Sequence, residues 1–227
     1  MQEQLTILGI SGSPRRANTD LLLAEALSAA GGSGIINTEM IKLREHPIEY
    51  CLGCFQCNEV NDTLSGCKIH RDAMDILTEK LIACHGLIMA SPVYFGGVTG
   101  QMKTFMDRTE PLLRYAPEPR GCALRNKVAA GISVGGNRNG GQEATLQSMH
   151  HFFMIHDMVV IGTGPDPQPG CYLGAAAFSG EHPQLGSQVK NAVEKDTIGM
   201  RAARIIGRRV AEMVTHLNRN PSGTLGR

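Results

Sequence analysis

Four of the seven cysteines fall in one short stretch, and their spacing is the clearest chemical signal in the sequence. Cys51, Cys54 and Cys57 stand three residues apart, and nine residues separate Cys57 from Cys67. Three thiolates at this spacing can surround one side of an iron–sulfur cubane, while a fourth from a later turn completes it. The C-x2-C-x2-C run of bacterial ferredoxins holds a [4Fe–4S] cluster with such spacing. We therefore expect these four cysteines to bind a [4Fe–4S] cluster.

Two other interpretations of the four cysteines stay open. Four thiolates also suit a tetrahedral zinc site, although zinc-binding cysteines usually come as two separated C-x2-C pairs. The third possibility is that they bind nothing. Of the remaining cysteines, Cys84 falls in a helix-like segment and is expected in the core, while Cys122 and Cys171 receive no role.

A glycine- and serine-rich loop after the first apolar run is the second candidate site. It reads Gly-Ile-Ser-Gly-Ser-Pro-Arg from residue 9 and continues to an Asn-Thr pair before a helix-like segment. Hydroxyls and backbone N–H groups at a helix N-terminus bind anions, because the helix dipole and the unpaired donors both favour negative charge. Neither a P-loop nor a G-x-G-x-x-G fingerprint is present. The candidate phosphate-binding residues are Ser11, Ser13, Arg15, Asn18 and Thr19. The alternative is an ordinary Ser/Asn/Thr helix cap.

The elements that must position these residues follow a βα alternation. Apolar, strand-like runs fall at 5–10, 35–43, 87–90, 128–134 and 158–161, and helix-like segments at 19–30, 72–84, 101–113, 141–156 and 197–217. Strands that are continuously apolar are buried on both faces, which predicts a doubly wound parallel sheet. We expect one domain over 1–227. It carries two segments longer than ordinary connections, the cysteine-rich insertion at 45–71 and a long loop at 162–194, and loops of this length are usually functional.

Three loops together resemble the flavodoxin-like, NADPH-dependent FMN reductase superfamily. The first is the glycine-serine loop, the second reads Ser-Pro-Val-Tyr-Phe-Gly-Gly from residue 91, and the third reads Gly-Gly-Asn-Arg-Asn-Gly-Gly from residue 135. The resemblance implies a five-stranded sheet in the order 2-1-3-4-5. It also implies that the first loop holds the FMN phosphate and that the other two flank the isoalloxazine ring, at the carboxyl ends of strands where open α/β sheets bind ligands. The ring-binding candidates are Pro92, Val93, Tyr94, Phe95, Gly96, Gly135, Gly136 and Asn137.

The cysteine insertion narrows the resemblance to the iron–sulfur flavoproteins, a branch of that superfamily, although the gap before Cys67 is longer than is usual there. This resemblance implies an FMN-dependent oxidoreductase whose flavin carries the chemistry, so no catalytic side chain is expected. Flavin and cluster together connect one- and two-electron carriers, with a ferredoxin-like protein or NAD(P)H as the electron donor. The alternatives are a cluster-free NAD(P)H-dependent FMN or quinone reductase, and a redox-sensing binding protein.

Charge and hydropathy exclude other classes of function and predict the setting. Lys plus Arg is 22 and Asp plus Glu is 21, which gives a formal net charge of +1. Such a balance argues against nucleic-acid binding, which favours a basic surface. No apolar run approaches the ~20 residues of a membrane span, and the N-terminus lacks a signal sequence, so we expect a cytoplasmic protein without membrane contact. An exposed cluster loop needs cover, which predicts a symmetric homodimer or homotetramer with the 51–67 loop beside a neighbour's 162–194 segment.

Two further patterns are given no functional role. Residues 131–135 satisfy G-x-S-x-G, the motif of a hydrolase nucleophile, but that motif requires a helix to begin at once and glycines intervene here. His150, His151 and His156 accompany Phe and Met residues without a carboxylate at ligand spacing, so we expect them in the core or at a subunit interface.

Overall fold

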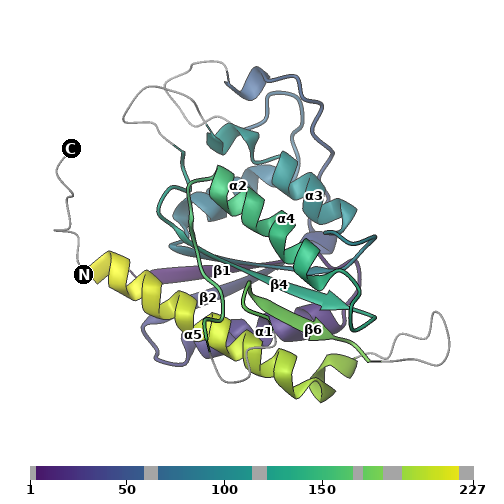
Figure 1. The fold of residues 1–227 in the computed structure, drawn as a ribbon. Coiled ribbons are helices and arrows are strands. Elements are labelled where there is room, and N and C mark those ends of the chain that lie inside the picture. The colour runs from purple at the N-terminus through teal and green to yellow at the C-terminus, as the bar shows by residue number, and fades with distance from the viewer. Residues whose placement is uncertain (1–3, 59–65, 114–121, 166–170, 181–190, 220–227) are drawn as a thin grey trace.

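A parallel sheet with helices on both faces organises the chain (Figure 1). The structure is a computed structural model and describes residues 4–58, 66–113, 122–165, 171–180 and 191–219. The strands are β1 (Leu5–Ser11), β2 (Ile36–Lys42), β3 (Gly86–Pro92), β4 (Val128–Gly135), β5 (Val159–Val160) and β6 (Ala175–Phe178). The α-helices are α1 (Asn18–Gly31), α2 (Met74–Ala83), α3 (Gly100–Asp107), α4 (Gln142–Ile155) and α5 (Thr197–Arg219). Short 3₁₀ turns are η1 (Leu43–Glu45), η2 (Gln56–Asn58), η3 (Glu110–Leu113) and η4 (Ala192–Lys195).

The strand order confirms the expected flavodoxin-like topology. The sheet runs β2-β1-β3-β4-β5, and every pairing is parallel. All seven residues of β3 and all eight of β4 are buried, as continuously apolar central strands require. The register pairs Ser11 with Ala90 and Pro92 with Val134, so the carboxyl ends of β1, β3 and β4 lie together at one edge of the sheet.

The strand beside β4 consists of two pieces, and the second was not expected. β5 pairs with Val128 and Ala129 at the start of β4, and β6 pairs with the stretch from Ile132 to Gly135 at its end. The segment 162–194, expected to be a long loop, therefore contributes a sixth strand. Its sequence, Ala-Ala-Ala-Phe, lacks the β-branched residues typical of strands, because small side chains suffice where the strand packs closely on both sides.

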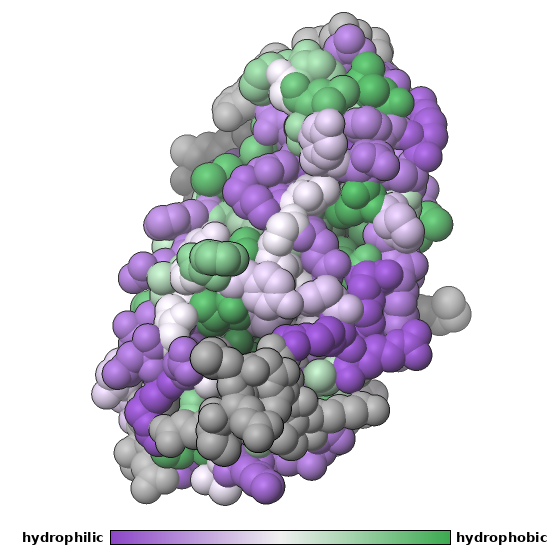
Figure 2. Space-filling view, turned by 90° about the vertical axis from the view of Figure 1, so that its right-hand side faces the viewer, coloured by the Kyte–Doolittle hydropathy of each residue, from purple (hydrophilic) through white to green (hydrophobic). Residues whose placement is uncertain are grey.

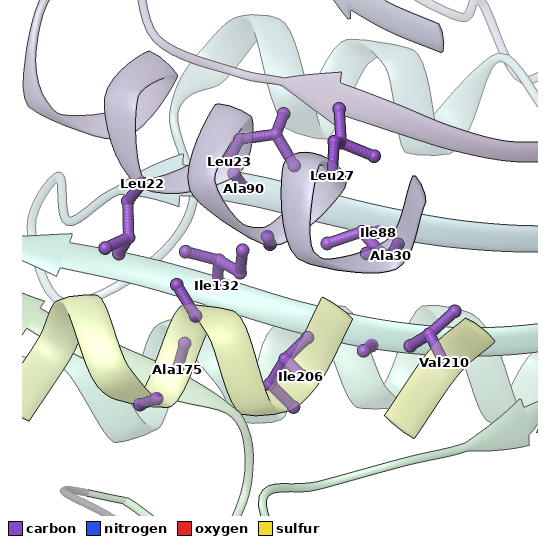
Figure 3. Close-up of a cluster of buried hydrophobic side chains, with 14 of the residues drawn as sticks. Leu22, Leu23, Leu27, Ala30, Ile88, Ala90, Ile132, Ala175, Ile206 and Val210 are labelled. Atoms are coloured by element: carbon purple, nitrogen blue, oxygen red, sulfur yellow. The ribbon is translucent and has the colours of Figure 1, made fainter. Parts of the chain in front are cut away.

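The helices divide between the two faces of the sheet. On one face α1 and α5 enclose a core that includes Leu23, Ile132 and Ile206 (Figure 3). On the other face α2, α3 and α4 pack against the sheet through side chains such as Leu77, Phe105 and Phe153. The segment between β2 and α2 lies above this second layer in Figure 1. The cysteines are therefore on the side of α3 and α4, and α5 lies on the opposite side of the sheet.

The helix expected over 101–113 is shorter than the sequence pattern indicates. α3 ends at Asp107, and the chain continues through Arg108 and Thr109 into the turn η3. Pro111 within that turn has no backbone N–H to continue an α-helical ladder. No helix in the described residues has the length and apolar character needed to cross a membrane.

Close packing of α1 on α5 generates the first prediction. A Cβ added at Gly207 would overlap the backbone carbonyl of Ala26, whereas one added at Gly100, at the start of α3, would meet no atom within 4 Å. We expect Gly207→Ala to lower the free energy of unfolding by about 3 kcal/mol because the helices must separate. Gly100→Ala, the matched control, is expected to leave it unchanged or raise it slightly. Chemical denaturation monitored by circular dichroism checks both, and equal stability of the two variants would contradict the packing.

Candidate flavin and cluster sites

The glycine-serine loop after β1 is held in shape by its own side chains. The buried Ser11 hydroxyl donates to Asp20 Oδ1 at 2.6 Å, and the Ser13 amide donates to Ser11 Oγ at 3.4 Å. Ser13 Oγ accepts from the amide of Arg15 at 3.2 Å and donates to its carbonyl at 2.9 Å. The Arg15 side chain is exposed at the rim. Ser11 and Ser13 thus shape the loop as well as line it.

Helix α1 begins without a side-chain cap. Its N-cap residue is Ala17, and no side chain accepts a hydrogen bond from the first turn, so the ordinary helix cap weighed from the sequence is wrong. Within the part of the chain that the structure describes, the backbone amides of Arg16, Ala17 and Thr19 have no hydrogen-bond acceptor. The side-chain oxygen of Asn18 instead accepts from the Val193 amide at 3.0 Å, which ties the loop to η4. Uncapped donors at a helix N-terminus are suited to bind an anion.

Arg44 supports this loop from outside it, and the sequence analysis did not identify it. Its guanidinium donates to the carbonyl oxygens of Ser13 and Arg15 at 3.3 and 3.1 Å, and it also pairs with Asp20 at 2.7 Å. Arg44 follows β2, whose carboxyl end lies beside that of β1 in the parallel sheet. The strand order was the available signal, since it places the residues after β2 next to the loop after β1.

The loop after β3 forms a tight turn with an exposed aromatic tip. Tyr94 and Gly97 exchange two backbone hydrogen bonds of 2.9 and 3.0 Å, and the two residues between them, Phe95 and Gly96, have φ values of 48° and 77°. A left-handed conformation is strained for phenylalanine and natural for glycine. Phe95 is fully exposed, while Pro92 is buried and Val93 half-buried. Backbone strain of this kind is concentrated at binding sites.

The three loops contact one another at the edge of the sheet. The Thr99 hydroxyl, at the N-cap of α3, donates to the Gly12 carbonyl at 2.7 Å and so joins the second loop to the first. A Cβ on Gly141 would lie 2.9 Å from the Cα of Gly96, so the third loop packs directly on the second. The Gln142 side chain holds the third loop by donating to the Asn137 carbonyl at 2.7 Å. The structure therefore brings the predicted flavin-binding loops together, with Gly136 and Asn137 exposed beside the turn.

All four cysteines of the insertion line one cavity of about 500 Å³. Its other walls come from the end of α3 and from η3, including Arg108, and from the end of α4, including Ile155 and His156. The cavity is mainly apolar, and Leu52, Phe55 and Ile155 on its walls are exposed by 54, 64 and 65%. Hydrophobic residues gather at this upper end of the molecule in Figure 2, where they adjoin hydrophilic ones. Among the described residues, no three Cys, His, Asp or Glu side chains converge on a point that would hold a single metal ion.

The thiols in this cavity influence one another electrostatically. Burial raises the pKa of Cys57, and the charges of Glu110, Cys67 and Cys51 raise it further. Backbone amides provide donors to sulfur, because the Gly53 amide lies 3.4 Å from Cys51 Sγ and the His70 amide 3.4 Å from Cys67 Sγ. Such N–H···S contacts are typical of sulfur atoms that carry negative charge in a cluster.

A buried ion pair fixes both ends of the insertion to the core. Arg108, 2% exposed, makes a two-pronged contact with Asp72 at 2.8 and 3.1 Å and donates to the Glu49 carbonyl at 2.6 Å. Asp72 in turn accepts from the Glu49 amide at 3.0 Å. Burial raises the pKa of Asp72, but the hydrogen bonds from Arg108 and the backbone outweigh it and leave this pKa below its usual value. The pair was not predicted, because 36 residues separate its partners in the chain.

The residues that the sequence analysis set aside lie mostly in the interior. Ser133 of the G-x-S-x-G sequence is fully buried within β4, so it is no exposed nucleophile. Cys84 is 2% exposed in the core, as expected. His150 and His156 are buried, whereas His151 is exposed. Cys171 lines a second cleft beside the third loop, and Cys122 Sγ donates to the His156 carbonyl at 3.0 Å.

Comparisons with known proteins agree with this architecture. The family model described as NADPH-dependent FMN reductase matches residues 5–165. An iron–sulfur flavoprotein of Methanocaldococcus jannaschii is 43% identical over 211 residues, which make up 92% of this chain and 97% of the relative. Another from Methanosarcina thermophila is 33% identical over 217 residues, or 95% and 98% of the two chains. The crystal structure of a WrbA-like flavodoxin from Agrobacterium tumefaciens superposes with a TM-score of 0.57 at 17% identity, covering 94% of this chain and 99% of that one.

The parallel sheet and its three converging loops define a protein of the flavodoxin-like fold, with an uncapped helix N-terminus at the carboxyl edge of the sheet, where open α/β sheets bind ligands. The chain belongs to the iron–sulfur flavoprotein branch of the NADPH-dependent FMN reductase family, and it is a flavin-dependent oxidoreductase.

His156, beneath the cysteine cavity, generates a pH-dependent prediction. Burial lowers its pKa to about 4, and its Nε2 lies 2.9 Å from the Thr109 hydroxyl. The folded protein keeps this histidine neutral, while the unfolded chain binds a proton below about pH 6.5. Stability from His156 is therefore complete above pH 6.5 and is lost as the pH falls towards 4, by about 3 kcal/mol in all.

Denaturation of the wild type and of His156→Gln at pH 7, 5.5 and 4.5 measures this effect. We expect a shallower dependence on pH in His156→Gln, and the exposed His151→Gln is the control that keeps the wild-type dependence. Parallel curves for the wild type and His156→Gln would contradict the assignment.

Proposed function

We propose that this oxidoreductase holds FMN on its three loops and a [4Fe–4S] cluster on Cys51, Cys54, Cys57 and Cys67. The observation that carries the proposal is that all four thiols face one cavity, although the chain that joins Cys57 to Cys67 is long. A cluster of four irons is larger than a single ion, and four thiols spread round a cavity suit it better than tetrahedral zinc, which needs all four sulfurs about 2.3 Å from one point. The names of the relatives, iron–sulfur flavoproteins, support the same choice.

Different residues of the chain would form the FMN site and the cluster site. The uncapped amides of α1, together with Ser13 and Asn18, would hold the FMN phosphate, while the turn at Tyr94–Gly97 and the Gly136–Asn137 strand end would lie along the ring. FMN supplies one- and two-electron chemistry and the cluster supplies one-electron chemistry. The protein's part is to bind both, to keep the phosphate end buried in the loop and to leave the ring edge open near Phe95.

The phosphate assignment is tested by comparing two ligands that differ only in the phosphate. We expect Ser13→Ala combined with Asn18→Ala to weaken FMN binding at least tenfold, because hydrogen bonds to a charged group contribute about 1.5–3 kcal/mol each. Riboflavin binding should fall much less than FMN binding, since riboflavin has no phosphate and loses only what the shape of the loop contributes. Flavin fluorescence titration of the apoprotein measures both, and the exposed Ser33→Ala is the control. Equal losses for FMN and riboflavin would place the phosphate elsewhere.

The cluster assignment is tested by removing one thiol at a time. We expect alanine at Cys51, Cys54, Cys57 or Cys67 to abolish the iron and acid-labile sulfide of anaerobically purified protein while FMN binding persists. Cys122→Ser is the matched control, because that sulfur lies outside the cysteine cavity and donates to the His156 carbonyl, a contact that a serine hydroxyl can also make. Zinc without sulfide in the wild type would overturn the cluster.

The same preparation separates the alternative functions. A cluster-free reductase would show flavin bands alone and turn over with NAD(P)H and a quinone. A redox-sensing protein would contain both cofactors yet fail to turn over with either NAD(P)H or a reduced ferredoxin, the two donors proposed here.

We further propose that the protein is a homodimer or homotetramer with the cysteine segment at a subunit interface. The exposed Leu52 and Phe55 at the rim of the cavity support this, since an apolar patch of this kind favours association. Leu52→Glu with Phe55→Glu is expected to lower the molar mass in analytical ultracentrifugation to that of one chain, 24.4 kDa. Ile35→Glu, at an exposed apolar residue outside both the cavity and the 162–194 segment, is the control. A monodisperse wild-type monomer would refute the assembly.

A further inference from the structure

Two residues of the cysteine cavity carry buried nitrogen atoms that lack a hydrogen-bond partner. In the part of the chain that the structure describes, His70 Nε2 and Arg108 Nε are both buried without a partner, and both residues line the cavity with the four cysteines. Buried side-chain nitrogens are nearly always hydrogen-bonded, because burying a donor without an acceptor costs about 1–3 kcal/mol. Two of the seven side-chain atoms in this state among the described residues belong to residues that line this cavity, and an acceptor bound there could partner both.

Arg108 is held through its two terminal nitrogens, and among the described residues Nε is its one nitrogen without a hydrogen-bond partner. Its two terminal nitrogens are occupied by Asp72 and the Glu49 carbonyl, at 2.6 to 3.1 Å, and its side chain is 1% exposed. Because a guanidinium is planar, these contacts also fix the direction of the remaining N–H group. The donor is therefore already oriented before any ligand binds.

His70 lies close to one of the proposed cluster ligands. It follows Cys67 by three residues, and its backbone amide lies 3.4 Å from Cys67 Sγ. This contact curls the chain after Cys67 and keeps the imidazole at the cavity wall. The described contacts provide no partner for its Nε2, and the four cysteines line the same cavity.

We propose that His70 Nε2–H and Arg108 Nε–H donate hydrogen bonds to sulfur atoms of the cluster and thereby raise its reduction potential. The inference rests on the proposed function, since it requires the cluster. Sulfide and thiolate sulfurs accept hydrogen bonds, and they gain negative charge when the cluster is reduced. N–H donors consequently stabilise the reduced form more than the oxidised form. His70 and Arg108 act here as positioning and tuning residues and are not ligands.

The His70 donor is tested with a pair of substitutions that keep or remove it. His70→Leu removes the N–H, while His70→Gln retains a side-chain N–H at a similar distance from the backbone. We expect His70→Leu to shift the cluster potential in the negative direction, by about 59 mV if the reduced form is destabilised tenfold. His70→Gln should restore most of the wild-type value. His216→Leu, on the exposed end of α5 across the sheet, is the control that leaves the potential unchanged.

The Arg108 donor is tested without substitution, because replacing Arg108 would also break the contacts with Asp72 and Glu49. Protein labelled with ¹⁵N-arginine, and separately with ¹⁵N-histidine, is reduced anaerobically and examined by pulsed electron paramagnetic resonance. We expect a ¹⁵N coupling to the reduced cluster in each sample. The histidine coupling should disappear in His70→Leu, and Arg108 is the one arginine among the described residues that line the cavity.

The outcomes separate this inference from the proposed function. Iron and sulfide absent from the wild type would overturn both. A full cluster content with an unchanged potential in His70→Leu, or with no ¹⁵N coupling from the labelled residues, would overturn the hydrogen bonds alone and leave the cluster assignment intact.

Discussion

The parallel pairing of β1, β3 and β4 is the constraint on which the rest of the structure depends. Its register pairs Ser11 with Ala90 and Pro92 with Val134, so the chain leaves all three strands at the same edge. Because both faces of these strands are covered by helices, the only free space for polar loops is at that edge. The contacts of Thr99 with Gly12 and of Gly141 with Gly96 follow from this placement.

The cysteine insertion depends on a different interaction, the buried pair of Arg108 and Asp72. Large apolar side chains of this segment, such as Leu52 and Phe55, are exposed, so they contribute little burial against the core. The pair joins the start of the insertion, at Glu49, to its end, at Asp72, and to the residue that follows α3. An ion pair this deeply buried costs desolvation energy, which good geometry and additional hydrogen bonds offset. Its position anchors the two ends of the segment that carries the cysteines.

Both sites carry backbone strain or unsatisfied polar groups, although such features also occur elsewhere in the described residues, for example at Ser133 and Asn126. Phe95 holds a left-handed backbone conformation at a fully exposed position, α1 begins without a cap, and His70 and Arg108 carry unpaired nitrogens at the cysteine cavity. Each of these features lowers the stability of the chain by itself. Each is explained when a ligand supplies the missing partner, which is the pattern expected of a protein built to hold two cofactors.

The sequence by itself determined the strands, the family and the loops of the site, because these follow from local patterns, and the strand order followed from the family resemblance. Continuous apolar runs identify buried parallel strands, the C-x2-C-x2-C spacing indicates a cluster, and glycine-rich turns mark the ends of β1, β3 and β4. Contacts between distant residues were decided only by the tertiary structure. The pairing of Arg108 with Asp72, the support of the first loop by Arg44 and the strand β6 depend on neighbours brought together by the sheet. A contact between two side chains that are far apart in the sequence produces no regular spacing of residue types, so the spacing cannot predict it.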